Sequence, residues 1–215
     1  MTDRLNKIFA VLPRCESFAD IGCDHGYIAK AMLKSGKCKK VIISDISAKC
    51  LEKAENLLTE EIKKGVAKSV VSNGFDNLDY CQVALIAGMG GEEICDILSR
   101  AKAQEKLPQT LIVQPMKNCD RVRLIALDCG YAVKFDKLFK SAGKFYNLIV
   151  LEKGKDFLTE EEIEFGRDNL KDRPAEFKEM IAESIMKLQF VLQGNLSKET
   201  EKSVKEKIIK LEKYV

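Results

Sequence analysis

Aspartates and glycines alternate near the start of the chain, in the spacing Asp20-x-Gly22-x-Asp24-x-Gly26. A mostly apolar, strand-like run at 17–21 leads into these residues, and helical apolar spacing begins just after them. Glycines let a ligand approach the backbone, and the first turn of a helix offers unpaired N–H groups. The pattern predicts a strand, a tight turn and a helix start that together bind a ligand.

Two known loops share this spacing, the GxGxxG dinucleotide fingerprint and the first motif of S-adenosylmethionine (SAM) methyltransferases. A dinucleotide would place a pyrophosphate beside Asp20 and Asp24, and these carboxylates would repel it, whereas they would attract the ammonium and sulfonium of SAM. Asp45 ends the apolar strand 41–45, at the distance where an acidic residue binds ribose hydroxyls in both ligands. Charge therefore favours SAM over a dinucleotide, and an ordinary strand-to-helix turn is the structural alternative.

The composition is that of a folded globular protein. The chain has 215 residues, of which 46% are hydrophobic and 32% charged. It contains no apolar run of membrane-spanning length and no signal-peptide core, so we predict a cytoplasmic protein. Eight cysteines without a CxxC pair, together with a single histidine, argue against a zinc site and favour reduced thiols that act as small hydrophobic residues.

Strands and helices alternate through residue 154, which predicts an α/β fold. We expect a mostly parallel sheet covered by helices on both faces, with an antiparallel strand in the final hairpin, and a ligand site at the carboxyl ends of the strands. The helix at 3–12 is expected to cover an edge of the sheet. The remaining expected elements are strands at 17–21, 41–45, 69–72, 83–87, 110–113, 131–139 and 145–151, and helices at 27–35, 47–65, 92–104 and 120–128.

The chain from 155 to 215 is predicted to be helical throughout. Thr159 and Glu162 form a capping-box pattern, and apolar stripes mark helices from Pro174 to about 193 and from Ser197 onwards. The two long stripes predict an antiparallel, coiled-coil-like hairpin. We therefore divide the chain into a Rossmann-like domain, 1–154, and a helical domain, 155–215. A stabilising or dimerising arm and a substrate-gripping arm are equally compatible with the pattern.

The chain resembles the bacterial tRNA (adenine-22 N1)-methyltransferase family, TrmK. Residues 19–28, ADIGCDHGYI, are close to the ADIGSDHAYL of that family, and residues 86–91, IAGMGG, are identical to its second glycine motif. Weaker matches lie at 111–116 and 145–151. The resemblance implies a class I SAM-dependent methyltransferase domain followed by a helical domain, with SAM as cofactor, tRNA as partner and no metal.

The resemblance also implies site residues. We expect the catalytic residues to be Asp24, Met89 and Gln114. Residues expected to bind the cofactor are Asp20, Gly22, Asp24, His25, Gly26, Tyr27, Asp45, Ile46, Asn73, Gly74, Ala87, Gly88 and Met89. The chain departs from the family at three positions: Gly26 replaces Ala, Asn73 stands where an Asp often contacts the cofactor adenine, and Met116 stands where Asn is common.

A basic cluster follows the strand at 110–113. Lys117, Arg121 and Arg123 lie beside a strand end that is expected to line the crevice, and we predict that they contact tRNA phosphates. The formal net charge of the whole chain is only +3. A solvated surface is therefore the alternative interpretation of this cluster.

Methylation at adenine N1 sets modest chemical demands. N1 carries an in-plane lone pair that is unprotonated at neutral pH, so the protein mainly positions a nucleotide that is unpaired or flipped out. Asp24 is expected to accept a hydrogen bond from the N6 amino group, or else to stabilise the turn. His25 is a turn or pocket contact, or alternatively a base, and Met89 lies at the crevice rim or packs under the loop. The rival functions are an NAD-dependent oxidoreductase and a non-catalytic RNA- or nucleotide-binding protein.

Overall fold

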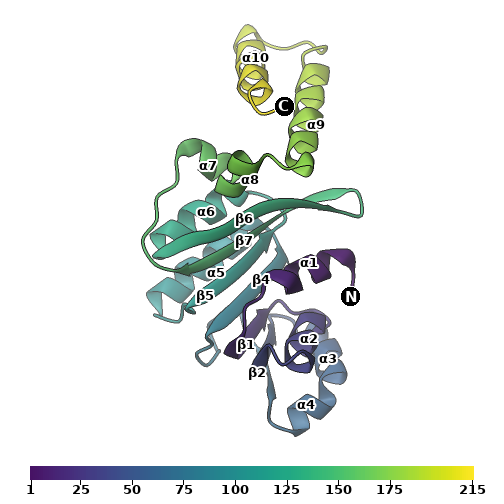
Figure 1. The fold of residues 1–215 in the computed structure, drawn as a ribbon, viewed down its shortest axis with the longest axis vertical. Helices are drawn as coiled ribbons and strands as arrows, with labels where there is room; N and C mark the ends of the chain where they lie inside the picture. Colours follow the sequence, from purple (N-terminus) through teal and green to yellow (C-terminus); the bar gives the residue numbers. More distant parts are fainter.

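A seven-stranded sheet forms the centre of the computed structural model, which describes residues 1–215 (Figure 1). Its strand order is β3-β2-β1-β4-β5-β7-β6, and β7 alone runs antiparallel to its neighbours. The predicted parallel sheet with one antiparallel strand in the last hairpin is thus confirmed. The strands are β1 (Cys15–Ile21), β2 (Cys38–Asp45), β3 (Ala67–Val71), β4 (Val83–Met89), β5 (Thr110–Pro115), β6 (Tyr131–Ser141) and β7 (Lys144–Lys153).

Helices cover both faces of this sheet. The helices up to residue 128 are α1 (Asp3–Val11), α2 (Tyr27–Lys34), α3 (Ala48–Leu57), α4 (Thr59–Lys63), α5 (Gly91–Ala103) and α6 (Cys119–Asp128). One core layer joins α1, α2 and α3 to the sheet, and the other joins α5 and α6 to the opposite face. The single helix expected at 47–65 is interrupted at Leu58, whose backbone (φ −103°, ψ 18°) is not helical.

Helix α1 lies on a face of the sheet and not at its edge, so that part of the prediction is wrong. Ile8 and Leu12 are buried in the same cluster as Phe18 of β1 and Leu85 of β4, two central strands. The apolar stripe of α1 therefore contributes to the main core. This position brings the first turn of α1 to the edge of the sheet where the parallel strands end.

Strand register aligns the carboxyl ends of the parallel strands. Asp20 of β1 is paired with Ile43 of β2 on one side and Leu85 of β4 on the other. The register between β4 and β5 shifts between Ala87 and Met89, so Gly88 is left out of the ladder while Met89 pairs with Pro115. Such a bulge re-aims the residues that follow it. The strand ends and the loops after them consequently meet along one edge of the sheet.

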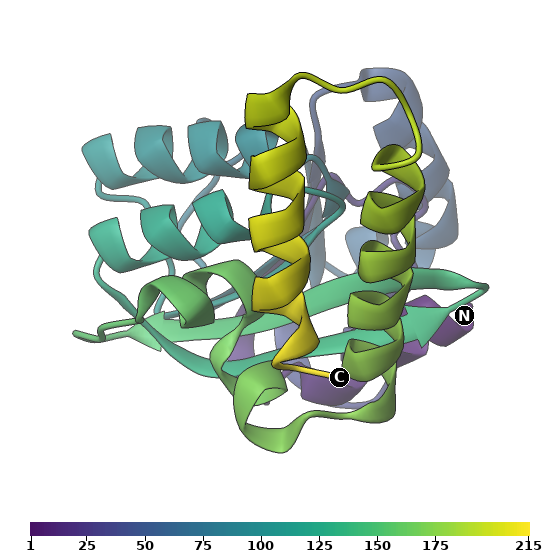
Figure 2. The same ribbon diagram turned by 90° about the horizontal axis from the view of Figure 1, so that it is seen from above.

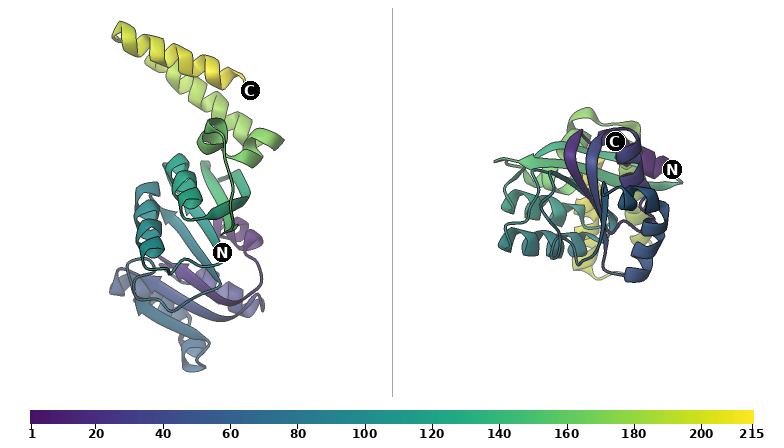
Figure 3. Two further views of the ribbon diagram at one scale, coloured as in Figure 1. Left: turned by 90° about the vertical axis from the view of Figure 1, so that its left-hand side faces the viewer. Right: turned by 90° about the horizontal axis from the view of Figure 1, so that it is seen from below.

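The chain after β7 is entirely helical, as predicted, and extends away from the sheet (Figures 1 and 3). Its helices are α7 (Glu160–Phe165), α8 (Arg167–Asp172), α9 (Ala175–Val191) and α10 (Lys198–Glu212). The capping box of Thr159 and Glu162 is present. Helices α9 and α10 lie side by side and antiparallel (Figure 2), and Phe177 of α9 packs with Leu211 of α10. None of the helices has the length and apolarity that a membrane crossing requires.

Candidate functional site

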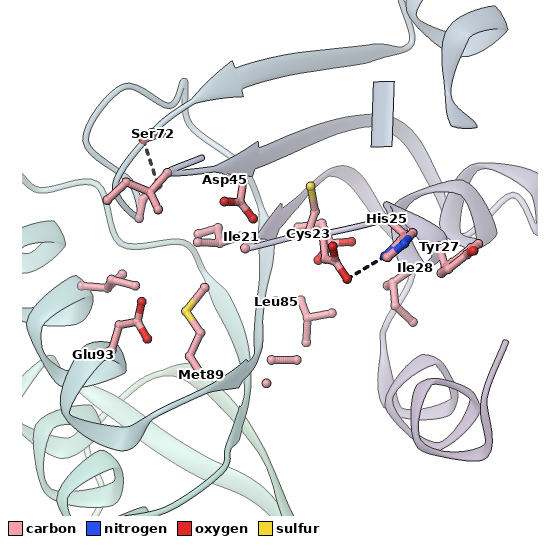
Figure 4. A pocket seen from close by; sticks show the side chains of 18 of the residues that line it. Ile21, Cys23, His25, Tyr27, Ile28, Asp45, Ser72, Leu85, Met89 and Glu93 are labelled. Carbon is pink, nitrogen blue, oxygen red and sulfur yellow. Dashed lines mark hydrogen bonds and ion pairs between the residues drawn. The ribbon is translucent and has the colours of Figure 1, made fainter. Parts of the chain in front are cut away.

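A cavity of about 370 Å³ opens at the edge where β1, β2, β3 and β4 end (Figure 4). Ligand sites commonly have this size and lie at this edge of α/β sheets. Twelve of the thirteen residues expected to bind the cofactor line the cavity; only Gly26 does not. The complete lining is Arg4, Leu5, Asp20, Ile21, Gly22, Cys23, Asp24, His25, Tyr27, Ile28, Asp45, Ile46, Ser72, Asn73, Gly74, Leu85, Ala87, Gly88, Met89, Glu93 and Ile97.

The turn between β1 and α2 depends on its two glycines. Gly22 has a φ of 69°, and any Cβ there would collide with the methyl end of Met89. Met89 therefore lines the cavity and also packs against the turn, which combines the two alternatives considered for it. Gly26 has a φ of 69° as well, and a Cβ there would lie 2.9 Å from the Cβ of Ala54. Gly26 thus lets α2 approach α3, and the cofactor contact expected of it stays a prediction.

Asp20 is a buried carboxyl group in the cavity wall. Asp20 is 6% exposed, and burial raises its pKa to about 7. A hydrogen bond from the backbone N–H of Ala29 acts in the opposite direction and lowers this pKa. Desolvation disfavours the ionised form of such a group. A cationic ligand beside Asp20 would lower this pKa again, because positive charge favours the ionised carboxylate.

Asp24 forms an ion-paired cluster at the cavity mouth. Its Oδ2 lies 2.6 Å from Nδ1 of His25, and its Oδ1 accepts from Nζ of Lys53 at 3.1 Å. Partial burial acts to raise the pKa of Asp24, but the hydrogen bonds from Lys53 and His25 outweigh it and hold this pKa below its usual value. The His25 ring also stacks on Tyr27, with 4° between their planes. These contacts favour the turn-stabilising interpretation of both Asp24 and His25.

Asp45 and Asn73 lie at the ends of the next two strands. Asp45 Oδ1 accepts from the backbone N–H of Ser47 at 2.9 Å, which orients the carboxylate at the cavity wall. The next residue, Ile46, is 68% exposed and offers an apolar surface to a ligand. Asn73 lines the same cavity, and its Oδ1 accepts from Nη2 of Arg100 at 2.8 Å.

Arg4 is a cavity residue that the sequence did not reveal. Its Nη1 donates to Oε1 of Gln114 at 2.6 Å, and its guanidinium lies 5.9 Å from the ring centre of Tyr146. Gln114 itself is fully buried and outside the cavity, with its Nε2 donating to the Pro115 carbonyl. Gln114 thus reaches the cavity only through Arg4, and the catalytic role expected of it stays a prediction that its place outside the cavity does not support. Arg4 in α1 and Gln114 in β5 are far apart in the sequence and meet only in the folded chain.

Arg123 was wrongly predicted to contact RNA. Its side chain is fully buried and forms a two-pronged ion pair with Asp136, at 2.6 and 2.9 Å. Nη1 also donates to the carbonyl groups of Ile163 and Glu164 in α7. Nothing in the sequence of α6 distinguished this buried arginine from the exposed Arg121. Arg123 therefore fastens the helical segment to the sheet.

The other two basic residues of that cluster are exposed. Arg121 pairs with Glu92 at 2.8 Å, and Lys117 extends over the glycine loop at Gly90. A Cβ on Gly91 would collide with the carbonyl oxygen of Lys117, so this glycine allows the 117–118 loop to lie against the start of α5. Lys117 and Arg121 thus lie near the strand end, as predicted, and their contact with RNA stays a prediction.

Acidic side chains predominate among the charged residues that line the cavity. Four carboxyl groups line it, those of Asp20, Asp24, Asp45 and Glu93, and Arg4 is the one lysine or arginine among the lining residues. SAM carries an ammonium, a sulfonium and a carboxylate, so its charges match such a wall, with Arg4 as the partner for the carboxylate. A pyrophosphate group would meet repulsion from the same carboxylates. The charges of the lining residues thus fit SAM better than a dinucleotide.

Residues 1–149 match the family model described as "Methyltransferase domain". A Mycoplasma pneumoniae protein with the provisional name of tRNA methyltransferase is 31% identical over 159 residues, covering 70% of this chain and 71% of that protein. The tRNA (adenine(22)-N(1))-methyltransferase of Bacillus subtilis is 27% identical over 161 residues, covering 72% and 66%. The structure of M. capricolum TrmK with S-adenosylhomocysteine (SAH) has a TM-score of 0.88 and 25% identity, covering 100% of this chain and 97% of that chain.

Proposed function

Because the chain belongs to the TrmK family of class I methyltransferases, we propose that it transfers a methyl group from SAM to N1 of adenine 22 in tRNA. The observation that carries the proposal is the cavity at the strand ends, with carboxyl groups along its wall and a single guanidinium at one position. Each charged group of SAM has an oppositely charged partner there. The relatives' names supply the RNA substrate and the position of the methylated base.

Four side chains are proposed to hold the cofactor. Asp45 accepts hydrogen bonds from the ribose hydroxyls, and Ile46 covers one face of the adenine. Asp20 attracts the positive charge of the methionine part, and Arg4 binds its carboxylate. The bound cofactor supplies an electrophilic methyl group on a sulfonium centre.

The protein's contribution to the reaction is mainly positioning. Adenine N1 needs no strong base, and both carboxylate oxygens of Asp24 already have partners, Nζ of Lys53 and the His25 ring. Met89 presents an apolar side chain at the cavity wall and is held there by its contact with Gly22. We infer that Met89 and the walls around it exclude water and orient the target base, so that its lone pair faces the methyl group.

RNA binding is assigned to the exposed basic residues near the strand ends. Lys117 and Arg121 are exposed and can bind phosphates. Arg121 must then give up its ion pair with Glu92. The hairpin of α9 and α10 stays a candidate for gripping tRNA or for contact with a second copy of the chain. We place the protein in the cytoplasm, where tRNA is modified in bacteria.

Methyl transfer from tritiated SAM to tRNA tests the proposal directly. We expect label in tRNA that has adenine at position 22 and no label when this base is guanine. Label that persists in the guanine variant would contradict the assigned position. SAM binding without transfer would leave a non-catalytic binder, and NAD binding in place of SAM would favour the oxidoreductase.

A further inference from the structure

One face of α5 lies against the loop that follows β3. Glu93, Ile97 and Arg100 are spaced by four and three residues, so they share a face of the helix. A Cβ on Gly74 would lie 2.7 Å from Ile97, and Arg100 donates to Oδ1 of Asn73 at 2.8 Å. In the view of Figure 4, Glu93 and Ser72 lie on one side of the cavity and His25 and Tyr27 on the other. This side of the cavity is therefore built jointly by α5 and the end of β3.

The amide of Asn73 has a fixed orientation. A guanidinium carries only donors, so the group that faces Arg100 must be the amide oxygen. Arg100 does not line the cavity, whereas Asn73 does. The oxygen of Asn73 thus already accepts from Arg100, and the NH2, a donor, lies on the other side of the amide. Such a donor is a poor partner for the 6-amino group of an adenine.

Glu93 offers an acceptor that is not held by another side chain, unlike the amide oxygen of Asn73. Its carboxylate lines the cavity one helical turn before Ile97 and has no ion pair or hydrogen bond to another side chain. The preceding residue differs, since Glu92 pairs with Arg121 at 2.8 Å and accepts from Asn118 at 2.9 Å outside the cavity. An ionised carboxylate can only accept hydrogen bonds. The cavity thus presents one uncommitted acceptor on the side where the end of β3 meets α5.

We propose that Glu93, and not Asn73, accepts the hydrogen bond from the 6-amino group of the cofactor's adenine. This inference rests on the proposed function, which places the adenine of SAM in this cavity. Glu93 then makes the site selective for adenine over hypoxanthine, which has a carbonyl oxygen at position 6. Two acceptors that face each other repel, whereas the amino group is bound.

Calorimetry with two ligands tests the inference on the full chain. SAH carries adenine, and S-inosylhomocysteine carries hypoxanthine on an otherwise identical molecule. We expect the wild type to bind SAH at least about tenfold more tightly, the usual effect of one mismatched hydrogen bond to a charged group. Glu93→Gln should reduce this preference to within about threefold, because the glutamine amide can donate to the carbonyl oxygen.

Two control variants make the outcome specific. Glu92→Gln changes the neighbouring carboxylate outside the cavity, and Asn73→Ala removes the amide; both should keep the wild-type preference. The inference is overturned if Glu93→Gln retains that preference, if Asn73→Ala abolishes it, or if the wild type has none. It is also overturned if Glu93→Gln leaves SAH affinity intact and raises only the KM for tRNA, since Glu93 would then face the target base. A wild type that binds neither SAH nor SAM would refute the proposed function as well.

Discussion

Replacing Arg123 by methionine should destabilise the fold. It should not reduce tRNA affinity, because other residues contact the tRNA. The guanidinium and the Asp136 carboxylate are both fully buried, and Arg123 donates to that carboxylate through two nitrogens. Methionine keeps an apolar side chain of similar reach but leaves Asp136 with a buried, unpaired charge. Breaking a buried pair in this way costs about 3–5 kcal/mol. The carbonyl groups of Ile163 and Glu164 lose their donor as well.

Urea denaturation followed by circular dichroism measures this loss. Arg121→Ala is the matched control, because its exposed pair with Glu92 should contribute at most about 1 kcal/mol. The double variant Arg123→Met with Asp136→Leu removes both charges, and we expect it to be more stable than Arg123→Met alone. A stability loss below about 1 kcal/mol for Arg123→Met, combined with a loss of tRNA affinity, would refute the reasoning and restore the RNA-binding role.

Three further predictions concern the cavity. Asp45→Ala should weaken SAM binding by about 1.5–3 kcal/mol by calorimetry, and an unchanged affinity in a folded variant would contradict the ribose contact. Asp24→Asn should change the single-turnover rate by less than about threefold, because its charge is already paired; a fall of tenfold or more would make it catalytic. SAM affinity should rise from pH 6 to pH 8 as Asp20 ionises through its pKa of about 7, and Asp20→Asn should remove this dependence. The raised pKa also means that the free energy of unfolding falls as pH increases from about 4 to 7, and Asp20→Asn should flatten that slope too.

The sequence predicted the sheet and the cofactor side of the cavity because both depend on local patterns. Strands β1, β2 and β4 each contain a short apolar run that ends at a glycine or a polar residue, and parallel strands place such ends at one edge. Asp20, Asp45 and Asn73 could therefore be placed in one site from their positions at strand ends. Leu58 was missed as a break between two helices because its apolar spacing fits a continuous helix.

Arginines were the least predictable residues, because an arginine's role depends on what packs around it. Arg121 and Arg123 are two residues apart on α6 and so point to different sides of the helix, one to solvent and one to the buried Asp136. The apolar pattern of α6 shows which face is buried but not that a guanidinium lies within it. Its partner, Asp136, lies on β6, and nothing local to either residue indicates the pair.

The first turn of α1 completes the cavity through contacts that span the chain. Arg4 and Gln114 are 110 residues apart, yet Nη1 of Arg4 lies 2.6 Å from Oε1 of Gln114. The glutamine is fully buried at the end of β5, and Gly88 of β4 has no side chain where the guanidinium lies, since a Cβ there would be 3.3 Å from Nη1. The guanidinium is thus held by a buried amide and retains free donors. It follows that α1 forms a wall of the cavity, because moving this helix would remove the one arginine that lines it.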